Sequence, residues 1–173
     1  MPPNFARLYF GFWIPQDVMA TVTAWRATQD FGPATKWVPP KNLHVTLHFL
    51  GEMPRSAIRH LIDTTATIQW TTARAQFIGL DVWNGDLAVL RVKLAPDLHK
   101  MHDALADVIR RAGITLEDRP WMPHVTIARQ VAVRRISAAP RPDWNVTSFA
   151  LVESLAGRYT ELASFPAASP VSR

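Results

Sequence analysis

The sequence predicts an α+β fold built on antiparallel sheet, and three observations lead to that class. Two β-like runs flank Asn84-Gly85, which is a strong hairpin turn signal. The stretch from Pro96 to Ala112 places apolar residues at helical spacing. Helix-like and strand-like segments are mixed along the whole chain. Because a hairpin requires antiparallel neighbours, this mixture indicates an α+β fold with antiparallel sheet.

Pro and Gly residues mark the boundaries of the expected elements in the first half of the chain. Pro15 suits the first turn of a helix, Pro39-Pro40 stiffens a connector, and Gly51 is expected to stop a strand. In chain order, we expect a strand at 7–14, a helix at 16–28, an extended connector at 37–41, a strand at 43–50 and a helix from 54 to about 67.

The second half predicts more strand than helix. Gly113 sits where a helix C-cap belongs, after the amphipathic stretch. In chain order, we expect strands at 75–83 and 87–94, a helix at 96–112, a strand at 124–128, a basic loop at 131–143, strands at 144–153 and 159–165, and a frayed tail at 166–173.

Composition and length predict one globular domain over residues 1–173. The chain carries 19 basic and 14 acidic residues, and 15 of the basic ones are Arg, the better bidentate partner for phosphate. Cysteine is absent, which excludes disulfides, thiolate metal sites and cysteine nucleophiles. No apolar run approaches the ~20 residues of a membrane span, and residues 1–7 lack a secretory signal pattern. We therefore expect a cytoplasmic protein with no membrane partner.

Two segments of the chain share one pattern. They are His44-Val45-Thr46-Leu47 and His124-Val125-Thr126-Ile127, each after a connector marked by Pro. Strand side chains alternate between faces, so His and Thr point one way and the apolar residues point into a core. Two such strands facing one space would bring together two imidazoles and two hydroxyls. Two half-buried strand histidines with Thr neighbours are the structural alternative.

Paired imidazoles suit phosphodiester chemistry. Cleavage needs a base for the incoming oxygen and an acid for the leaving one, and histidine titrates near neutral pH. One ring can therefore be neutral while the other is protonated, without a metal. Hydroxyl groups and an Arg can stabilise the charge on the phosphate oxygens. The pattern thus favours acid–base cleavage of a phosphodiester.

These paired motifs resemble the 2H phosphoesterase superfamily, and within it the RNA 2′,3′-cyclic phosphodiesterase branch, historically called 2′-5′ RNA ligases. Further stretches similar to that branch are Arg7-Leu8-Tyr9-Phe10, Trp37-Val38-Pro39-Pro40, Phe49-Leu50-Gly51-Glu52, Arg119-Pro120-Trp121-Met122-Pro123 and the ending from Phe149 to Pro166. The resemblance implies two similar α+β lobes, each an antiparallel sheet with helices, that face each other across a central cleft. It also implies metal-independent hydrolysis to a 2′-phosphate, with no cofactor.

The resemblance assigns roles to individual residues. His44 would be the proton donor to the leaving ribose 3′ oxygen, and His124 the proton acceptor that activates water. Thr46 and Thr126 would hold the phosphate, which Arg129 would also contact. Strict strand alternation places Arg129 on the face opposite His124. Either the strand twists or ends before Arg129, or that side chain contacts something else.

Aromatic residues near the motifs are candidates to stack on a nucleobase. Trp37 and Trp121 each precede a motif strand, and Phe10 lies on the first strand. The alternative for each is a place in the core. Trp13 and Trp121 are larger than the residues common in the family, and they could alter the wall against which a base stacks.

The other histidines have simpler expectations. By strict alternation His48 shares a face with the first motif, where it could touch a substrate phosphate or ribose; we expect it instead to face solvent near the sheet end. His99 and His102 lie three apart on a helix beside Asp103, and we expect them on its surface rather than on a metal. His60 is expected to be exposed. The sequence therefore predicts no metal site.

The expected partner is an RNA with a 2′,3′-cyclic phosphate end, or a small cyclic-phosphate nucleotide, bound by a monomer. Reverse 2′-5′ ligation stays open on energetic grounds. One alternative is a phosphodiesterase of this class that acts on another small cyclic phosphate or on a 2′-5′ oligonucleotide. A second alternative is a non-catalytic module that binds RNA ends through the basic loop 129–141.

Overall fold

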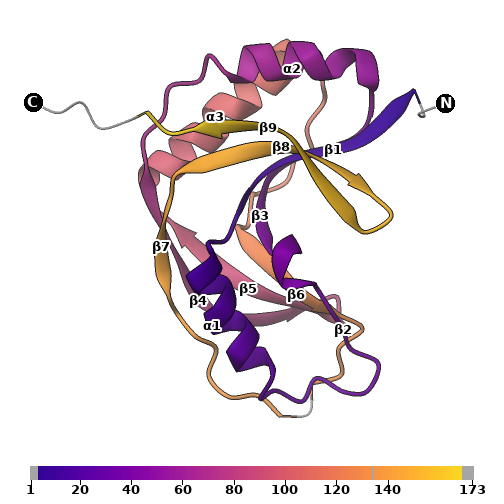
Figure 1. Cartoon of the computed structure of the whole chain (residues 1–173), viewed down its shortest axis with the longest axis vertical. Helices are drawn as coiled ribbons and strands as arrows, with labels where there is room; N and C mark the ends of the chain where they lie inside the picture. Colours follow the sequence, from indigo (N-terminus) through magenta and orange to yellow (C-terminus); the bar gives the residue numbers. More distant parts are fainter. Residues whose placement is uncertain (1–3, 134, 169–173) are drawn as a thin grey trace, which may run out of the picture.

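Two antiparallel sheets form the two lobes of the protein (Figure 1). The structure is a computed structural model that describes residues 4–133 and 135–168. Sheet A has the strand order β3-β1-β8-β9, and sheet B has the order β2-β6-β5-β4-β7. The strands are β1 (Phe5–Trp13), β2 (Lys36–Trp37), β3 (His44–Pro54), β4 (Ala73–Trp83), β5 (Leu87–Leu94), β6 (His124–Arg129), β7 (Asp143–Val146), β8 (Ser148–Leu155) and β9 (Arg158–Pro166). The α-helices are α1 (Gln16–Arg26), α2 (Ile58–Thr65) and α3 (Pro96–Arg111).

The two lobes repeat one arrangement of strand, helix and returning strand. β3 runs antiparallel to β1 after α1, and β6 runs antiparallel to β5 after α3. Each returning strand begins at the histidine of one motif. The pattern that two segments of the sequence share therefore corresponds to a repeated arrangement in the structure.

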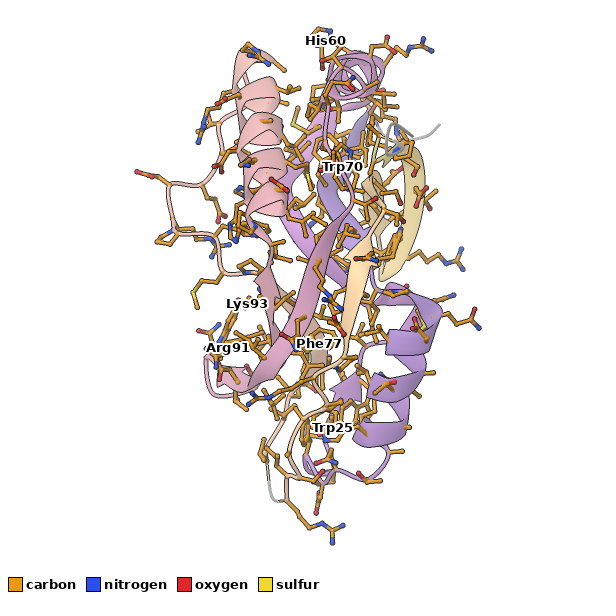
Figure 2. All side chains as sticks on the ribbon, turned by 90° about the vertical axis from the view of Figure 1, so that its left-hand side faces the viewer. Trp25, His60, Trp70, Phe77, Arg91 and Lys93 are labelled. Atoms are coloured by element: carbon orange, nitrogen blue, oxygen red, sulfur yellow. The ribbon has the colours of Figure 1, made fainter. Side chains whose placement is uncertain are left out.

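Each of these helices reaches the lobe to which its own strand does not belong. α1 follows β1 of sheet A but lies beside sheet B, and α3 follows β5 of sheet B and contacts both β4 of that sheet and β3 of sheet A (Figure 1). One cluster of buried apolar side chains consequently runs through both lobes. Phe77 on β4 belongs to it, and Trp25 on α1 packs against it (Figure 2). Arg91 projects from the opposite side of sheet B to α1 (Figure 2).

Local signals explain the ends of several elements. Asn84 and Gly85 both have positive φ, +53° and +83°, as a type I′ hairpin turn requires. α3 ends in a Schellman motif, because Gly113 has a φ of +79° and donates its N–H to the Arg110 carbonyl at 2.9 Å. The next N–H, that of Ile114, bonds the Ile109 carbonyl at 3.2 Å. The predicted hairpin and helix end are confirmed.

Three sequence expectations about boundaries are wrong. β3 continues through Gly51, which takes a φ of +73° inside the strand, so α2 starts only at Ile58 after a 3₁₀ turn. The single strand expected at 144–153 is two strands, because the chain leaves sheet B and enters sheet A at Thr147. The tail is not frayed at Pro166, which pairs with Ser148 in sheet A. Residues 169–173 lie outside the described part of the chain.

Candidate active site

The first motif lies on one face of sheet A. Directly paired residues of antiparallel strands point to the same face, and His44 pairs with Trp13 while Thr46 pairs with Gly11. We call this the site face of sheet A. Val45 and Leu47 point the other way and are buried, as the alternation predicts. Gly11 is required here, since a Cβ at this position would stand 2.6 Å from the Val45 carbonyl oxygen.

A β-bulge reverses the alternation just after the first motif. Phe10 pairs with His48 and Gly11 pairs with Thr46, so Leu47 is an extra residue on β3. His48 therefore shares the face of the buried Phe10, not that of His44. The prediction that His48 shares a face with the first motif and faces solvent is wrong. Its imidazole stacks on His102 of α3, with ring centroids 4.0 Å apart.

A second bulge acts on the second motif in the opposite sense. Ala88 pairs with Ala128 and Val89 pairs with Thr126, so Ile127 is the extra residue on β6. Ile127 and Ala128 are both fully buried, and the next residue, Arg129, is exposed. Arg129 thus returns to the face of Thr126, and the conflict between strict alternation and a phosphate contact disappears. We call this face the site face of sheet B.

The two histidines are held by the same local bond. His44 Nδ1 lies 2.7 Å from the Asn42 carbonyl oxygen, and His124 Nδ1 lies 2.7 Å from the Met122 carbonyl oxygen. A carbonyl only accepts, so each Nδ1 carries a proton and donates it. In the neutral imidazole, Nε2 is then the free acceptor. Both rings are therefore prepared to exchange a proton at Nε2.

His44 lies in a box of aromatic rings on the site face. Tyr9 stacks on it at a centroid distance of 4.8 Å, while Tyr159 and Trp13 meet it edge-on at 5.3 and 5.6 Å. Burial lowers the pKa of His44, and the charge of His124 lowers it further, although the bond to the Asn42 carbonyl opposes both. β3 and β6 contact each other, which brings the two imidazoles within electrostatic reach.

His124 has a more open setting. Its ring contacts Trp83 at a centroid distance of 4.4 Å, and it pairs across the ladder with Arg91. Arg91 forms an ion pair of 3.0 Å with Asp81. Burial lowers the pKa of His124, and the positive charge of Arg119 adds to that effect. A neutral imidazole is therefore favoured at this position.

Arg129 lines a hollow of about 350 Å³ at the end of sheet B. The hollow is bounded by Lys36, Asn84, Asp86, Leu87, Arg129 and Gln130. Lys36 is the direct ladder partner of Arg129, so two cations stand side by side next to Thr126. This is the positively charged part of the site.

Phe10 and Trp37, two of the candidates to stack on a nucleobase, face the core of the protein. Phe10 is fully buried between Phe149 and Phe165, so the prediction that it stacks on a base is wrong. Trp37 pairs with the buried Ala128 and stacks on Phe31 at 5.0 Å, which places it on the core side of β2 and contradicts the same role. Both residues lie on strands whose sequence pattern does not show which face is buried in the core.

Trp121 is near the first motif but is engaged by protein groups. Its Nε1 donates to the Thr46 carbonyl at 3.0 Å, and its ring stacks on His102 at 3.8 Å with an interplanar angle of 5°. His102 has a side-chain exposure of only 13 %, so its expected place on the helix surface is wrong. His48, His102 and Trp121 form one column of stacked rings behind the first motif. His60 is exposed, as predicted (Figure 2).

Sequence reasoning missed Asn42, a buried polar residue. Its carbonyl fixes His44, and its side-chain Nδ2 donates to the Gly157 carbonyl at 3.3 Å in the turn between β8 and β9. Asn42 thus joins the first motif to the hairpin that carries Tyr159. The stretch Asn42-Leu43-His44 was visible in the sequence, but only the fold shows what the amide meets.

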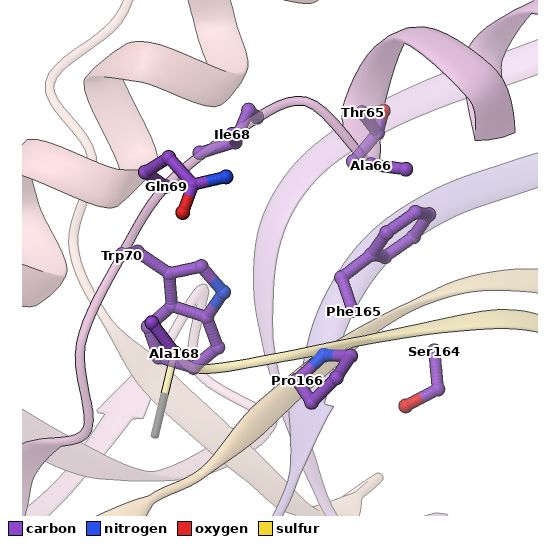
Figure 3. Close-up of a pocket in the computed structure, with 9 residues that line it drawn as sticks. All are labelled: Thr65, Ala66, Ile68, Gln69, Trp70, Ser164, Phe165, Pro166 and Ala168. Atoms are coloured by element: carbon purple, nitrogen blue, oxygen red, sulfur yellow. The ribbon is translucent and has the colours of Figure 1, made fainter. Parts of the chain in front are cut away.

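A separate hollow of about 210 Å³ lies between the end of α2 and the end of β9 (Figure 3). Trp70 and Phe165 line it, and no motif residue does. Within residues 4–133 and 135–168, no group of three or more His, Asp or Glu side chains is arranged to hold a metal ion. In the same described part of the chain, no helix is both long and apolar enough to cross a bilayer.

The two-lobe α+β fold with one His-x-Thr strand in each sheet is that of a two-histidine phosphoesterase. A family model of the 2′-5′ RNA ligase superfamily matches residues 14–158, and the chain belongs to that superfamily. Both the predicted fold class and the resemblance stated from the motifs are confirmed.

Individual relatives agree with this membership. The chain is 30 % identical over 137 residues to the RNA 2′,3′-cyclic phosphodiesterase of Bacillus subtilis, covering 75 % of this chain and 74 % of that protein. It is 26 % identical over 164 residues to the RNA 2′,3′-cyclic phosphodiesterase of Escherichia coli, covering 86 % of each. The crystal structure of E. coli LigT complexed with 3′-AMP superposes with a TM-score of 0.81 at 26 % identity, over 95 % of this chain and 99 % of that one.

Proposed function

We propose that this chain is a metal-independent RNA 2′,3′-cyclic phosphodiesterase that opens a terminal cyclic phosphate to a 2′-phosphate. The observation that carries the proposal is the matched pair of imidazoles, each of which donates from Nδ1 to a backbone carbonyl and can therefore exchange a proton at Nε2. Relatives along most of the chain bear the name of this activity. One bilobal monomer would suffice, because each sheet supplies one motif.

The reaction needs one proton removed and one supplied. His124 Nε2 takes a proton from water as the water oxygen attacks phosphorus. The bond between phosphorus and the ribose 3′ oxygen breaks, and His44 Nε2 gives its proton to that oxygen. One P–O bond forms and one breaks, so the product is a 2′-phosphomonoester with a free 3′ hydroxyl. The same steps, with an RNA 5′ hydroxyl in place of water as the attacking group, would form a 2′-5′ phosphodiester bond, which is ligation.

The surroundings of His124 support its role as the base. The lowered pKa of His124 favours the neutral ring that a base must have. The more buried His44 must be protonated to act, and a bound phosphate anion would favour its charged form. Thr46 and Thr126 share the site faces with these rings, and their hydroxyls would donate to the phosphate. Arg129 would offset charge beyond Thr126.

A defined end-group assay tests the proposal. A short RNA ending in a 2′,3′-cyclic phosphate is incubated in EDTA with the parent protein, His44→Ala and His124→Ala, and with His60→Ala as the matched control. We expect the parent and the control to form a 2′-phosphate and each motif variant to lose ~10²–10⁴-fold in rate. Activity that EDTA abolishes and a divalent metal restores would overturn the mechanism. Unchanged turnover in both motif variants would overturn the site.

A second experiment distinguishes the enzyme from the alternative, a non-catalytic module that binds RNA ends. RNA affinity is measured for the parent and for the double variant. If the parent forms no product from any cyclic phosphate, yet both proteins bind the RNA end equally, the chain is a binding module and the proposal fails. Addition of an RNA with a 5′ hydroxyl to the same reaction detects ligation.

A further inference from the structure

We propose that Trp13, Tyr159 and Glu161 form a nucleobase subsite beside His44, in which the Glu161 carboxylate selects guanine as the terminal base. The inference rests on the proposed function, because it uses the position of the leaving oxygen. It goes further in naming which nucleoside the site prefers and which side chain makes the choice.

The position of the subsite follows from the chemistry at His44. The leaving oxygen belongs to the terminal ribose, and the acid must reach it at hydrogen-bond distance. The terminal ribose therefore lies against the His44 ring, and its base must lie over the side chains that flank that ring. Those side chains are Trp13 and Tyr159, at centroid distances of 5.6 and 5.3 Å from His44.

Trp13 and Tyr159 offer the surface that a base needs. They are neighbours, with centroids 6.4 Å apart and an interplanar angle of 37°, and both are partly exposed. Tyr9, the third ring around His44, is buried and is closed to a ligand. Stacking of a base on an aromatic side chain tolerates any base, because every base has a flat π-face. The two rings therefore hold a base without choosing it.

Glu161 supplies the choice. It pairs with Val152, the ladder partner of Tyr9, and so it stands on the site face of sheet A. Its Oε2 accepts the Trp13 Nε1–H at 2.9 Å, which fixes the carboxylate beside the stacking rings. The bond to Trp13 uses only part of the accepting capacity of the carboxylate, and its remaining lone pairs can accept from a donor on the base.

The donor edge that fits a carboxylate best is that of guanine. A carboxylate has two oxygens and about four lone-pair sites, and Trp13 occupies one of them. Guanine presents N1–H and the N2 amino group side by side, which matches a bidentate carboxylate. Adenine and cytosine each present one amino group beside an acceptor nitrogen, and uracil presents one N–H between two carbonyls. The acceptors beside those donors face the carboxylate unfavourably.

The subsite is built before any ligand binds. Leu155 pairs with Arg158, so β8 and β9 are joined by the two-residue turn Ala156-Gly157. Both turn residues have positive φ, +48° and +78°, as in a tight type I′ turn. Asn42 Nδ2 holds the Gly157 carbonyl at 3.3 Å. The strand that carries Tyr159 and Glu161 is therefore fixed relative to His44, and little ordering is needed on binding.

The test compares the four nucleoside 2′,3′-cyclic monophosphates as substrates of the parent, Glu161→Gln and Glu52→Gln. Glu52 is the matched control, because it makes the same charge change eight residues beyond His44 on β3. A bidentate pair discriminates by ~1–3 kcal/mol, so the parent should prefer the guanosine substrate at least about fivefold in kcat/KM. Glu161→Gln should lower that value for guanosine alone, and Glu52→Gln should leave the preference intact.

Binding of the nucleoside 2′-monophosphates by calorimetry gives a readout that needs no turnover. Tighter binding of the guanosine product than of the adenosine product, lost in Glu161→Gln, supports the subsite even where the proposed hydrolysis fails. Equal binding of the two products, or equal kcat/KM for all four substrates, overturns the subsite and leaves the hydrolysis standing. A Trp13→Leu variant should weaken binding of all four products, and of the guanosine product most, because the indole both stacks on the base and holds the Glu161 carboxylate. Unchanged affinity would overturn that part.

Discussion

Trp121 and Thr46 are joined by a hydrogen bond of 3.0 Å from the indole Nε1 to the backbone carbonyl. Trp121 precedes His124 by three residues, so this bond ties the approach to the second motif to the first motif strand. Because the two catalytic candidates lie on different sheets, a fixed point between the sheets helps to set their separation, in addition to the direct contact of β3 with β6. Trp121 is thus a positioning residue in the proposed reaction.

Trp121→Phe should therefore lower kcat more than it raises KM. Phenylalanine keeps a ring against His102 but lacks the N–H that reaches Thr46. A small misplacement of reacting groups is costly, and we expect a loss of about tenfold in kcat. Steady-state kinetics at a temperature well below unfolding measures it.

The matched control is Trp144→Phe. Trp144 Nε1 is buried and, among the described residues, has no hydrogen-bond partner, so the same change removes volume but no bond. The control should lower the melting temperature and leave kcat unchanged. If both variants lose kcat equally, the indole bond has no positioning role.

Gly11→Ala should damage the first motif selectively. An added Cβ would meet the Val45 carbonyl at 2.6 Å and the Tyr9 ring at 3.1 Å, so β1 and β3 must separate beside His44. Overpacking of this kind costs about 1–3 kcal/mol, and we expect activity to fall with it. Gly113→Ala is the comparison, since its strain comes from a φ of +79° with nothing within 4 Å. It should lose stability but keep kcat, and equal kcat in the two variants would contradict the prediction.

The motif pair could be predicted from sequence because its information is local. A His-x-Thr run places its own side chains on one face, wherever the strand lies. Arg129 and His48 could not be placed, because each follows a bulge that depends on the partner strand. Phe10 was misplaced for another reason. β1 is apolar on both faces, with residues 8–12 all buried, so its alternation carries no sign of which face meets the core.

The pH dependence of kcat/KM should be bell-shaped, with its maximum below pH ~6.5, the ordinary pKa of histidine. The base must be neutral and the acid protonated, so activity is greatest midway between the two pKa values. Burial lowers both the pKa of His44 and that of His124, and the midpoint moves with them. A profile of kcat/KM against pH, measured in a series of buffers that contain EDTA, checks this prediction. A maximum above pH 7 would contradict the assignment of these two groups.

The column of rings behind the first motif should make the fold sensitive to acid. Burial lowers the pKa of His48 to about 4; the positive charges of His102 and Arg110 act in the same direction, and the bond to the His102 carbonyl and the charge of Asp103 oppose it. In the unfolded chain this pKa returns to ~6.5. Between these values the unfolded state binds more protons, so the free energy of unfolding falls as the pH falls through that window.

His48→Gln isolates this contribution. The glutamine amide can still donate to the His102 carbonyl, which His48 Nε2 approaches to 2.9 Å, but it cannot be protonated in this range. Melting temperatures are measured from pH 7.5 to pH 4.5 for the parent, His48→Gln and the exposed control His60→Gln. The parent and the control should lose stability more steeply below pH 6.5 than His48→Gln does. Parallel curves for all three would show that protonation of His48 is not coupled to unfolding.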